Sequence, residues 1–237
     1  MILLLVGLAC GFETAANDHL ELKWMRDSEE FSALTTQVFL QAEQSVRTQA
    51  SGRQRQPWTV IVDIDETLLD NTPYFLEMAA YNRPFDWPSW DAWCARETAE
   101  PVPGAQAFLL AVRDAGGRVA FVSNRHERTR EVTVNNLRAQ GMWTDEDRMC
   151  LLTDDDSYTK RERRRQLRDG DGACGWDEPV NVFAYAGDTM ADLPEPDEDG
   201  GRWEQLGVRT FVLPNPAYGK WEHGVTRPGL IVTDGID

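Results

Sequence analysis

The chain has 237 residues, a net charge of −16 at pH 7 and 41% hydrophobic residues. This length accommodates one sizeable α/β domain with an insertion, and the apolar content is sufficient for a packed core. The negative charge repels nucleic-acid backbones and anionic membrane surfaces, so we expect no nucleic acid polymer as a partner. An anionic substrate would need local cations, such as a metal ion, a lysine or an arginine cluster.

The first ten residues, MILLLVGLAC, are too short to span a bilayer and are typical of the apolar part of a secretion signal. Leu8-Ala9-Cys10-Gly11 resembles a lipoprotein cleavage box. It predicts a lipid anchor on Cys10 and secretion to the periplasm or outer membrane, whereas the alternative is a buried N-terminal strand or helix. We expect residues 1–27 to form a signal followed by a polar tether.

Helices and strands alternate along the rest of the chain. Ser28 can cap a helix that runs to Ala50, and an apolar strand then ends at Asp63. Residues 73–100 are rich in Tyr, Trp and Pro, which predicts short helices outside the main sheet. Further helices are predicted at 104–115, 127–139 and 159–168, and further strands at 118–122, 149–152, 182–186 and 210–213.

This alternation predicts an α/β fold in which a mainly parallel sheet is flanked by helices, with a small helical side domain. We assign 57–72 and 101–237 to the core, 28–56 to an N-terminal helix within the side domain, and 73–100 to an aromatic-rich insertion. Ligands of such sheets bind beyond the carboxyl ends of the strands. Polar residues follow three of the predicted strands at that end.

Asp63 and Asp65 directly follow the first apolar strand. Residues i and i+2 of an extended chain share a face, so both carboxylates can point at one small volume. Two like charges so close repel unless a cation or a proton lies between them, and Mg²⁺ prefers such oxygen ligands. A carboxylate can also act as a covalent nucleophile. The alternative is an ordinary acidic turn at a strand end.

Three later signals belong with this pair. Ser123, after the second strand, offers a hydroxyl to a phosphate oxygen, although it can equally serve as a helix cap. Lys160 opens a basic helix and offers a cation, although a single cation there can also be solvent-exposed. The loop from Gly187 supplies two more carboxylates, Asp188 and Asp192. Their order and their placement after apolar strands favour one shared site.

These motifs resemble the haloacid dehalogenase (HAD) superfamily, and most closely its class C acid phosphatases, the secreted bacterial lipoprotein phosphatases and 5′-nucleotidases. Residues 61–74, IVDIDETLLDNTPY, match the first motif, and residues 187–192, GDTMAD, match the last. Further similarity lies at 90–93, 101–104, 122–125 and 213–219, so that the resemblance extends over roughly 28–224.

The resemblance implies a Mg²⁺-dependent phosphatase mechanism. Asp63 is the implied nucleophile, and Asp65 is the implied general acid and base. The implied metal site comprises Asp63, the backbone carbonyl of Asp65, and Asp188, with Asp192 acting through water. Ser123, Asn124 and Lys160 are the residues implied to hold the phosphoryl oxygens.

Aromatic residues suggest the specificity. The resemblance favours Tyr74, Trp90 and Tyr218 as the wall of a pocket for a nucleobase or an aromatic ester, although each can equally pack the side domain. It also implies a homodimer.

Other functions remain open at this stage. One is a sugar or other small-molecule phosphatase, and another is a non-catalytic ligand-binding or storage lipoprotein. The redox state of Cys94, Cys150 and Cys174 also stays open, because free buried thiols and a single disulfide both fit the sequence.

Overall fold

The structure is a computed structural model that describes residues 19–52, 57–153, 159–171 and 174–223. The predicted lipid-bearing Cys10 and the predicted signal lie outside these residues. Among the described residues, no helix combines the length and the apolar content that crossing a membrane requires.

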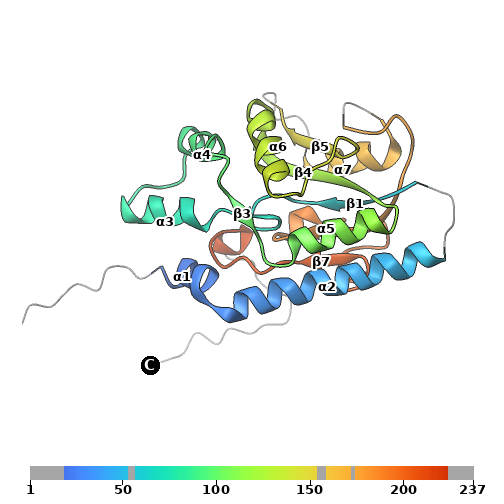
Figure 1. Ribbon diagram of the computed structural model, residues 1–237, viewed down its shortest axis with the longest axis horizontal. Helices are drawn as coiled ribbons and strands as arrows, with labels where there is room; N and C mark the ends of the chain where they lie inside the picture. The colour runs from blue at the N-terminus through green and yellow to red at the C-terminus, as the bar shows by residue number, and fades with distance from the viewer. Residues whose placement is uncertain (1–18, 53–56, 154–158, 172–173, 224–237) are drawn as a thin grey trace, which may run out of the picture.

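Five parallel strands form the central sheet (Figure 1). They are β1 (Trp58–Val62), β4 (Arg118–His126), β5 (Arg148–Leu152), β6 (Asn181–Gly187) and β7 (Thr210–Val212), arranged in the order β5-β4-β1-β6-β7. All four pairings are parallel, and β1 lies at the centre between β4 and β6. The predicted α/β fold with a parallel sheet is therefore confirmed.

Alternate residues of the strands supply two apolar layers because successive side chains point to opposite faces. Val60 and Val62 of β1 pack in the layer that includes Phe108 of α5 (Ala105–Asp114). Ile61 packs in the opposite layer with Leu167 of α7 (Lys160–Asp169). Helices thus cover both faces, and such strands are apolar throughout rather than alternating.

Two further helices border the first layer. They are α2 (Glu29–Ser51) and α6 (Arg130–Ala139), and α6 follows the short 3₁₀ helix η1 (Glu127–Thr129). Ser28 caps α2 as predicted, because its hydroxyl accepts a hydrogen bond from the Phe31 amide at 3.0 Å. We expected this helix in the side domain, but α2 contacts α5, β6 and β7, and Figure 1 shows it running along the sheet.

The segment that we predicted as a polar tether ends in a helix, α1 (Leu20–Asp27). Leu22 and Met25 are buried, and α1 contacts α3. Two apolar residues three apart suffice for one buried helical face when a neighbouring helix covers them. The tether prediction was therefore wrong for 20–27, because the short apolar pattern was hidden among charged residues.

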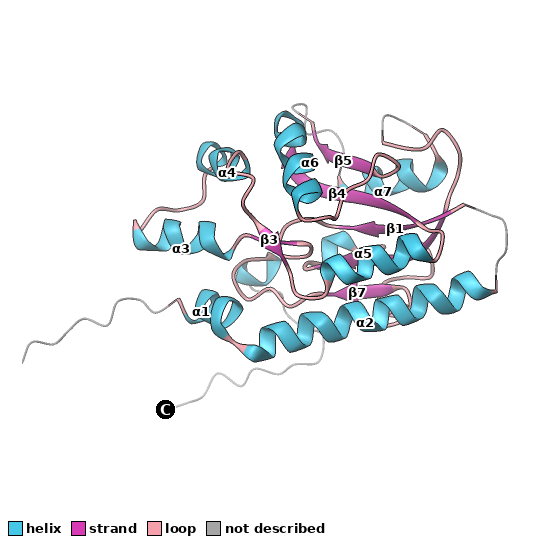
Figure 2. Ribbon diagram, viewed as in Figure 1, coloured by secondary structure: helices cyan, strands magenta, loops and turns pink. Residues whose placement is uncertain are grey.

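The insertion after β1 forms a separate helical lobe (Figure 2). It contains α3 (Thr72–Ala80) and α4 (Trp87–Cys94), as predicted, between two short strands, β2 (Leu69–Asp70) and β3 (Glu100–Pro101). These strands pair antiparallel and so bring the two ends of the insertion together. The lobe therefore joins the core at a narrow neck beside the carboxyl end of β1.

The length of β4 differs from the prediction, and the structure decides between the two alternatives that the sequence left open for the cysteines. β4 extends to His126, four residues beyond the predicted end, because it resumes pairing with β5 after a register shift. Cys150 of β5 forms a disulfide with Cys174, whereas Cys94 is free and buried. The short 3₁₀ helices η2 (Met190–Asp192) and η3 (Lys220–His223) complete the described elements.

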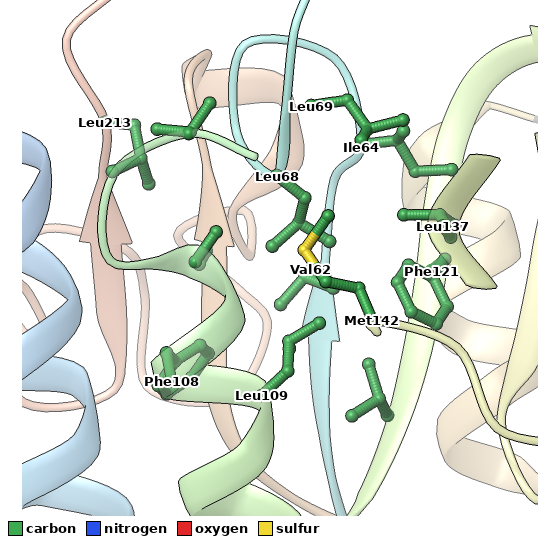
Figure 3. Close-up of a cluster of buried hydrophobic side chains, with 14 of the residues drawn as sticks. Val62, Ile64, Leu68, Leu69, Phe108, Leu109, Phe121, Leu137, Met142 and Leu213 are labelled. Atoms are coloured by element: carbon green, nitrogen blue, oxygen red, sulfur yellow. The ribbon is translucent and has the colours of Figure 1, made fainter. Parts of the chain in front are cut away.

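The first apolar layer gives a direct test of the core (Figure 3). Leu109 and Leu110 are neighbours on α5, but Leu109 is fully buried while Leu110 is 59% exposed. We expect Leu109→Ala to lower the free energy of unfolding by about 2–5 kcal/mol because it leaves a cavity. Leu110→Ala should change it by about 0.5 kcal/mol or less. Urea unfolding of the two variants measures this, and equal losses would contradict the assigned packing.

Candidate active site

The carboxyl end of β1 turns sharply and presents Asp63 at the edge of the sheet. The Asp63 amide donates to the Ala186 carbonyl at 2.9 Å, so the residue is still anchored to β6. The amides of Leu68 and Leu69 both donate to the Ile64 carbonyl, at 2.8 and 2.9 Å, which closes a tight loop directly beyond Asp65. Both carboxylates are thus fixed close to the end of the central strand.

Three carboxylates meet at this edge. Ligand oxygens of Asp63, Asp188 and Asp192 all lie within 4.8 Å of one another. Gly187 permits this approach, because a Cβ atom there would lie 2.2 Å from the Asp192 Cβ. The Asp192 carboxylate is further fixed by the Thr189 amide at 2.9 Å and the Thr189 hydroxyl at 2.7 Å. The structure thus places side by side the ends of β1 and β6, from which the sequence predicts one shared site.

Lys160 is the cation of this cluster. It is the first residue of α7, whose N-terminus is capped by the Thr159 hydroxyl. Its Nζ lies 2.8 Å from Asp63 Oδ1 and also forms an ion pair with Asp192. The side chain is 10% exposed, so the pair is screened little by solvent. Lys160 is therefore a buried cation beside Asp63 and not a solvent-exposed charge.

Burial and mutual repulsion disturb the protonation of these groups. Burial is the main cause that raises the pKa of Asp63 well above its ordinary value, and Lys160 only partly offsets it. Burial and then the neighbouring Asp192 raise the pKa of Asp188 to about 7. For Lys160, burial alone would lower the pKa, but Asp192 and Asp63 outweigh it and raise the value. The cluster therefore contains more negative charge than Lys160 alone neutralises.

Asp65 faces a different set of partners. Its Oδ1 accepts from Arg125 Nη2 at 2.7 Å, from Asn71 Nδ2 at 2.9 Å and from Arg125 Nε at 3.0 Å. The Ser123 hydroxyl lies 3.3 Å from Oδ2. We had not assigned roles to Arg125 and Asn71. Two signals were present: both residues lie in stretches that match the family, 61–74 and 122–125, and Arg125 lies two residues after Ser123 on the same face of the extended chain.

The phosphate-binding candidates on β4 differ in exposure. Ser123 is buried beside Asp65, while Asn124 is exposed. Arg163 of α7 donates to the Ser123 carbonyl and, at 2.6 Å, to Asn124 Oδ1. The basic helix therefore holds the end of β4 as well as Asp63.

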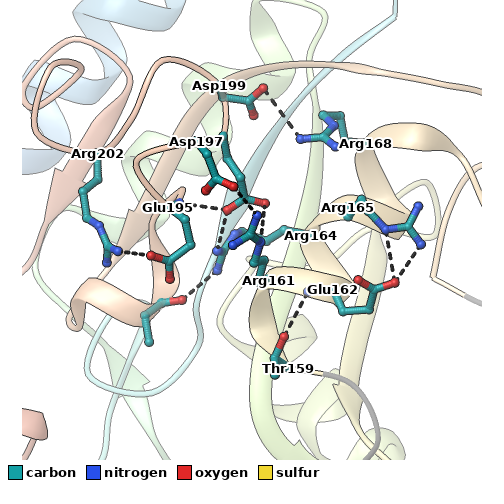
Figure 4. A network of polar contacts seen from close by, with 12 residues as sticks. Thr159, Arg161, Glu162, Arg164, Arg165, Arg168, Glu195, Asp197, Asp199 and Arg202 are labelled. Carbon is teal, nitrogen blue, oxygen red and sulfur yellow. Dashed lines mark hydrogen bonds and ion pairs between the residues drawn. The ribbon is translucent and has the colours of Figure 1, made fainter.

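The rest of α7 is tied to an acidic loop (Figure 4). Its ion pairs with that loop are Arg161–Asp197 at 2.8 Å, Arg164–Glu198 at 3.4 Å and Arg168–Asp199 at 3.8 Å. Arg164 also donates to the Ala191 carbonyl at 2.7 Å, next to Asp192. These arginines thus hold α7 against the segment 191–199, which directly follows the loop that carries Asp188 and Asp192.

The three predicted pocket residues lie in or against the helical lobe. Tyr74 and Trp90 are 1% and 5% exposed and pack edge to face with ring centroids 5.0 Å apart. Tyr218 is partly buried and lies against Phe75, with ring centroids 5.2 Å apart. Their packing role is thus visible in the contacts, while their role toward a leaving group stays a prediction.

Glu66 is a further buried acid that we had not included in the site. It accepts from the Asn71 amide at 2.9 Å and from the Tyr218 hydroxyl. Burial, and next the nearby Asp65, raise the pKa of Glu66 to about 8. Its φ of 54° lies in the left-handed region, where a residue without glycine's freedom is strained. Glu66 thus connects Tyr218 to the loop after β1 through a hydrogen bond.

The residues present fit a hard divalent cation. Asp63, Asp188 and Asp192 offer only oxygen ligands, which is the donor type that Mg²⁺ prefers. Burial, and then repulsion from neighbouring carboxylates, raise the pKa of Asp63 and of Asp188, and a bound cation would oppose both effects. Asn215 donates to Asp188 Oδ2 at 2.7 Å, which orients this carboxylate within the cluster.

Fold and site together define the class of protein. A parallel sheet with helices on both faces, two aspartates after its central strand and a lysine with further aspartates from later segments are typical of HAD-type phosphoryl-transfer proteins. A family model described as HAD superfamily, subfamily IIIB (acid phosphatase), matches residues 10–221. The chain therefore belongs to this acid phosphatase family, as its first and last motifs predicted.

Similar proteins include plant and bacterial examples. Acid phosphatase 1 of Solanum lycopersicum is 30% identical over 170 residues, which are 69% of this chain and 59% of that protein. Vegetative storage protein 1 of Arabidopsis thaliana is 30% identical over 161 residues, 67% of this chain and 54% of that protein. The class C acid phosphatase of Bacillus anthracis shares the fold, with a TM-score of 0.71, 22% identity and coverage of 86% of this chain and 85% of that one. The chain thus spans less than two thirds of the two curated plant relatives.

The acidic cluster predicts a pH-dependent response to magnesium. Because burial raises the pKa of Asp188 to about 7, the metal-free fold keeps a proton that the unfolded chain loses above its ordinary pKa of 3.8. Its stability should therefore fall as the pH rises from about 4 to about 7. Mg²⁺ binds ionised carboxylates, so it should raise Tm more at about pH 8 than at about pH 5.

Calorimetry with Mg²⁺ and with EDTA measures this difference. Asp188→Asn should remove most of the magnesium response, whereas Asp145→Asn, at a side chain that is 93% exposed, should leave it unchanged. A magnesium shift of Tm that is equal at both pH values, or unchanged in Asp188→Asn, would contradict the metal assignment.

Proposed function

We propose that this protein is a Mg²⁺-dependent acid phosphatase that hydrolyses phosphomonoesters through a phosphoaspartate on Asp63. The observation that carries the proposal is the position of the Asp63 carboxylate at the end of the central strand, 2.8 Å from Lys160 and within the cluster of Asp188 and Asp192. A buried carboxylate so placed can act as a nucleophile if the charge of an incoming phosphoryl group is neutralised.

In the first proposed step, an oxygen of Asp63 attacks phosphorus and the bond from phosphorus to the ester oxygen breaks. The ester oxygen leaves with a proton from Asp65, so that an alcohol is released and Asp65 is left ionised. Lys160, Ser123 and Asn124 are proposed to hold the phosphoryl oxygens. Lys160 already forms an ion pair with Asp63, so it can shift toward a phosphoryl oxygen as the Asp63 charge is consumed.

In the second proposed step, Asp65 takes a proton from a water molecule. The water oxygen attacks phosphorus, the bond from phosphorus to Asp63 breaks, and inorganic phosphate leaves. Asp63 is then an ionised carboxylate again and Asp65 is protonated for the next substrate. Both steps use the same two side chains, which the loop after β1 holds close to the strand end.

The proposed metal ligands are Asp63, Asp188 and the backbone carbonyl of Asp65, with Asp192 acting through water. A bound Mg²⁺ would supply positive charge to the phosphoryl oxygens and to the carboxylates that hold it. The same positive charge would offset the repulsion between an anionic substrate and a chain of net charge −16.

We further propose that the protein acts outside the cytoplasm, attached by a lipid on Cys10. The apolar segment before Cys10 and the disulfide between Cys150 and Cys174 support this, because disulfides persist in oxidising compartments.

Nucleoside 5′-monophosphates and aromatic phosphates are the proposed substrates, on the strength of the aromatic lobe beside the site. Phosphate release from nucleotides, sugar phosphates and p-nitrophenyl phosphate, with Mg²⁺ and with EDTA, tests this. We expect metal-dependent release that is fastest with nucleotides and aromatic esters. A preference for sugar phosphates would keep the mechanism and reject the aromatic pocket. No release from folded protein would favour a storage role such as the name of the Arabidopsis relative indicates.

The nucleophile can be tested by one substitution. Asp63→Asn should keep the fold but lower kcat by about a thousandfold or more, because an amide cannot form the phosphoaspartate. Asp145→Asn, which changes an exposed carboxylate paired with Arg138, serves as the control and should keep full activity. Turnover close to that of the unchanged protein in Asp63→Asn would reject Asp63 as the nucleophile.

A further inference from the structure

The two oxygens of the Asp65 carboxylate are bound unequally. Oδ1 accepts three hydrogen bonds, at 2.7 and 3.0 Å from Arg125 and at 2.9 Å from Asn71. Oδ2 has only two long contacts, each of 3.3 Å, with Ser123 Oγ and Arg125 Nε. Since a carboxyl oxygen accepts about two good hydrogen bonds, Oδ1 is saturated and Oδ2 has a lone pair to spare.

We propose that Arg125 is a positioning residue that anchors Oδ1 of Asp65 and so assigns proton transfer to Oδ2. The inference rests on the proposed function, because it concerns the acid and base of that reaction. When a phosphoryl oxygen takes the Ser123 hydroxyl, Oδ2 loses one of its two long contacts and keeps only the one of 3.3 Å with Arg125 Nε, so a lone pair remains for the proton. Arg125 acts through the Asp65 carboxylate, which it holds mainly by Oδ1, and has no proposed contact with the phosphoryl group.

Arg125 is itself held rigidly, as a positioning residue must be. Its side chain is 1% exposed, and its Nη1 donates to the Thr133 hydroxyl at 3.2 Å. Its guanidinium lies over the Trp90 ring, 5.7 Å from the centroid. The planar guanidinium binds Asp65 through two nitrogens, which fixes the orientation of a carboxylate better than a single ammonium does.

Asn71, the second donor to Oδ1, is held by the helical lobe. The indole nitrogen of Trp93 donates to Asn71 Oδ1 at 2.8 Å, which directs the amide nitrogen of Asn71 at Asp65. Trp90 and Trp93 both belong to α4, so one helix of the lobe supports both donors. Through these two donors the lobe sets the orientation of Asp65.

A merely structural salt bridge would affect every substrate alike, whereas a role in proton transfer would depend on the leaving group. A nitrophenolate leaves without needing a proton, but an alkoxide needs one as its bond breaks. The ratio kcat/KM covers only the steps up to release of the first product. It therefore reports the acid role of Asp65 separately from the later hydrolysis of the phosphoaspartate.

The experiment compares kcat/KM for glycerol 2-phosphate and for p-nitrophenyl phosphate, with saturating Mg²⁺. Arg125→Met should lower kcat/KM for the alkyl ester by about tenfold or more beyond its effect on the aryl ester. Arg125→Lys should recover part of that difference, because it restores the charge but not the two-nitrogen contact. Trp93→Phe keeps an aromatic ring but removes the donor to Asn71. It should also lower kcat/KM more for the alkyl ester than for the aryl ester, by a smaller factor than Arg125→Met does.

Arg113→Met is the matched control, because Arg113 forms a bridge of 2.7 Å with the buried Asp147 away from the proposed reacting groups. It should lower stability while leaving the ratio between the two esters unchanged. If Arg125→Met does not fold, Arg125→Lys and Trp93→Phe carry the test. If the variants stay active but lose kcat/KM equally for both esters, the inference is overturned and the proposed function is not. An unmodified protein that hydrolyses neither ester would overturn the proposed function and the inference together.

Discussion

The confinement of several carboxylates at one buried edge of the sheet is the constraint on which the rest of the structure depends. Like charges at short distance in a poorly solvated place repel strongly, so each needs a cation or a set of donors. The chain supplies Lys160 to Asp63 and Asp192, and Arg125 to Asp65. Because each cation is assigned to different carboxylates, the two neighbouring aspartates of the first motif have different environments and can have different chemistry.

Two parts of the chain, α7 and the helical lobe, support these two environments separately. Helix α7 carries Lys160 at its first turn, and its arginines bind the backbone of Ser123 and Ala191, so one helix spans the ends of β4 and β6. On the other side, the helical lobe supports Asn71 and Arg125. A displacement of either support would leave a buried charge without its partner, which is costly. The two sides of the site are therefore fixed by two different parts of the chain.

The sequence predicted the strands and the main site because both follow from local patterns. Apolar runs that end in polar residues located Asp63, Ser123 and Asp188, and parallel topology brought them to one edge. Arg125 and Asn71 were missed as site residues because their role depends on where their side chains point. Arg125 is 60 residues from Asp65 in the sequence and Asn71 is six, and no local pattern shows that both point at its carboxylate. Helix α1 was missed because its buried face is defined by a partner helix and not by its own composition.

The aromatic lobe has two faces that a sequence cannot distinguish. Tyr74 and Trp90 are buried and pack within the lobe, whereas Phe85 and Trp87 are 50% and 40% exposed. Trp87 also lies against His126 at the end of β4, with ring centroids 4.0 Å apart. The Tyr74 and Trp90 rings pack α3 against α4, the helix that contacts Asn71 and Arg125, so an aromatic residue there can matter for catalysis without touching a substrate. Contact with a flat leaving group needs exposed ring surface, and the exposed pair beside β4 provides more of it than the buried pair does.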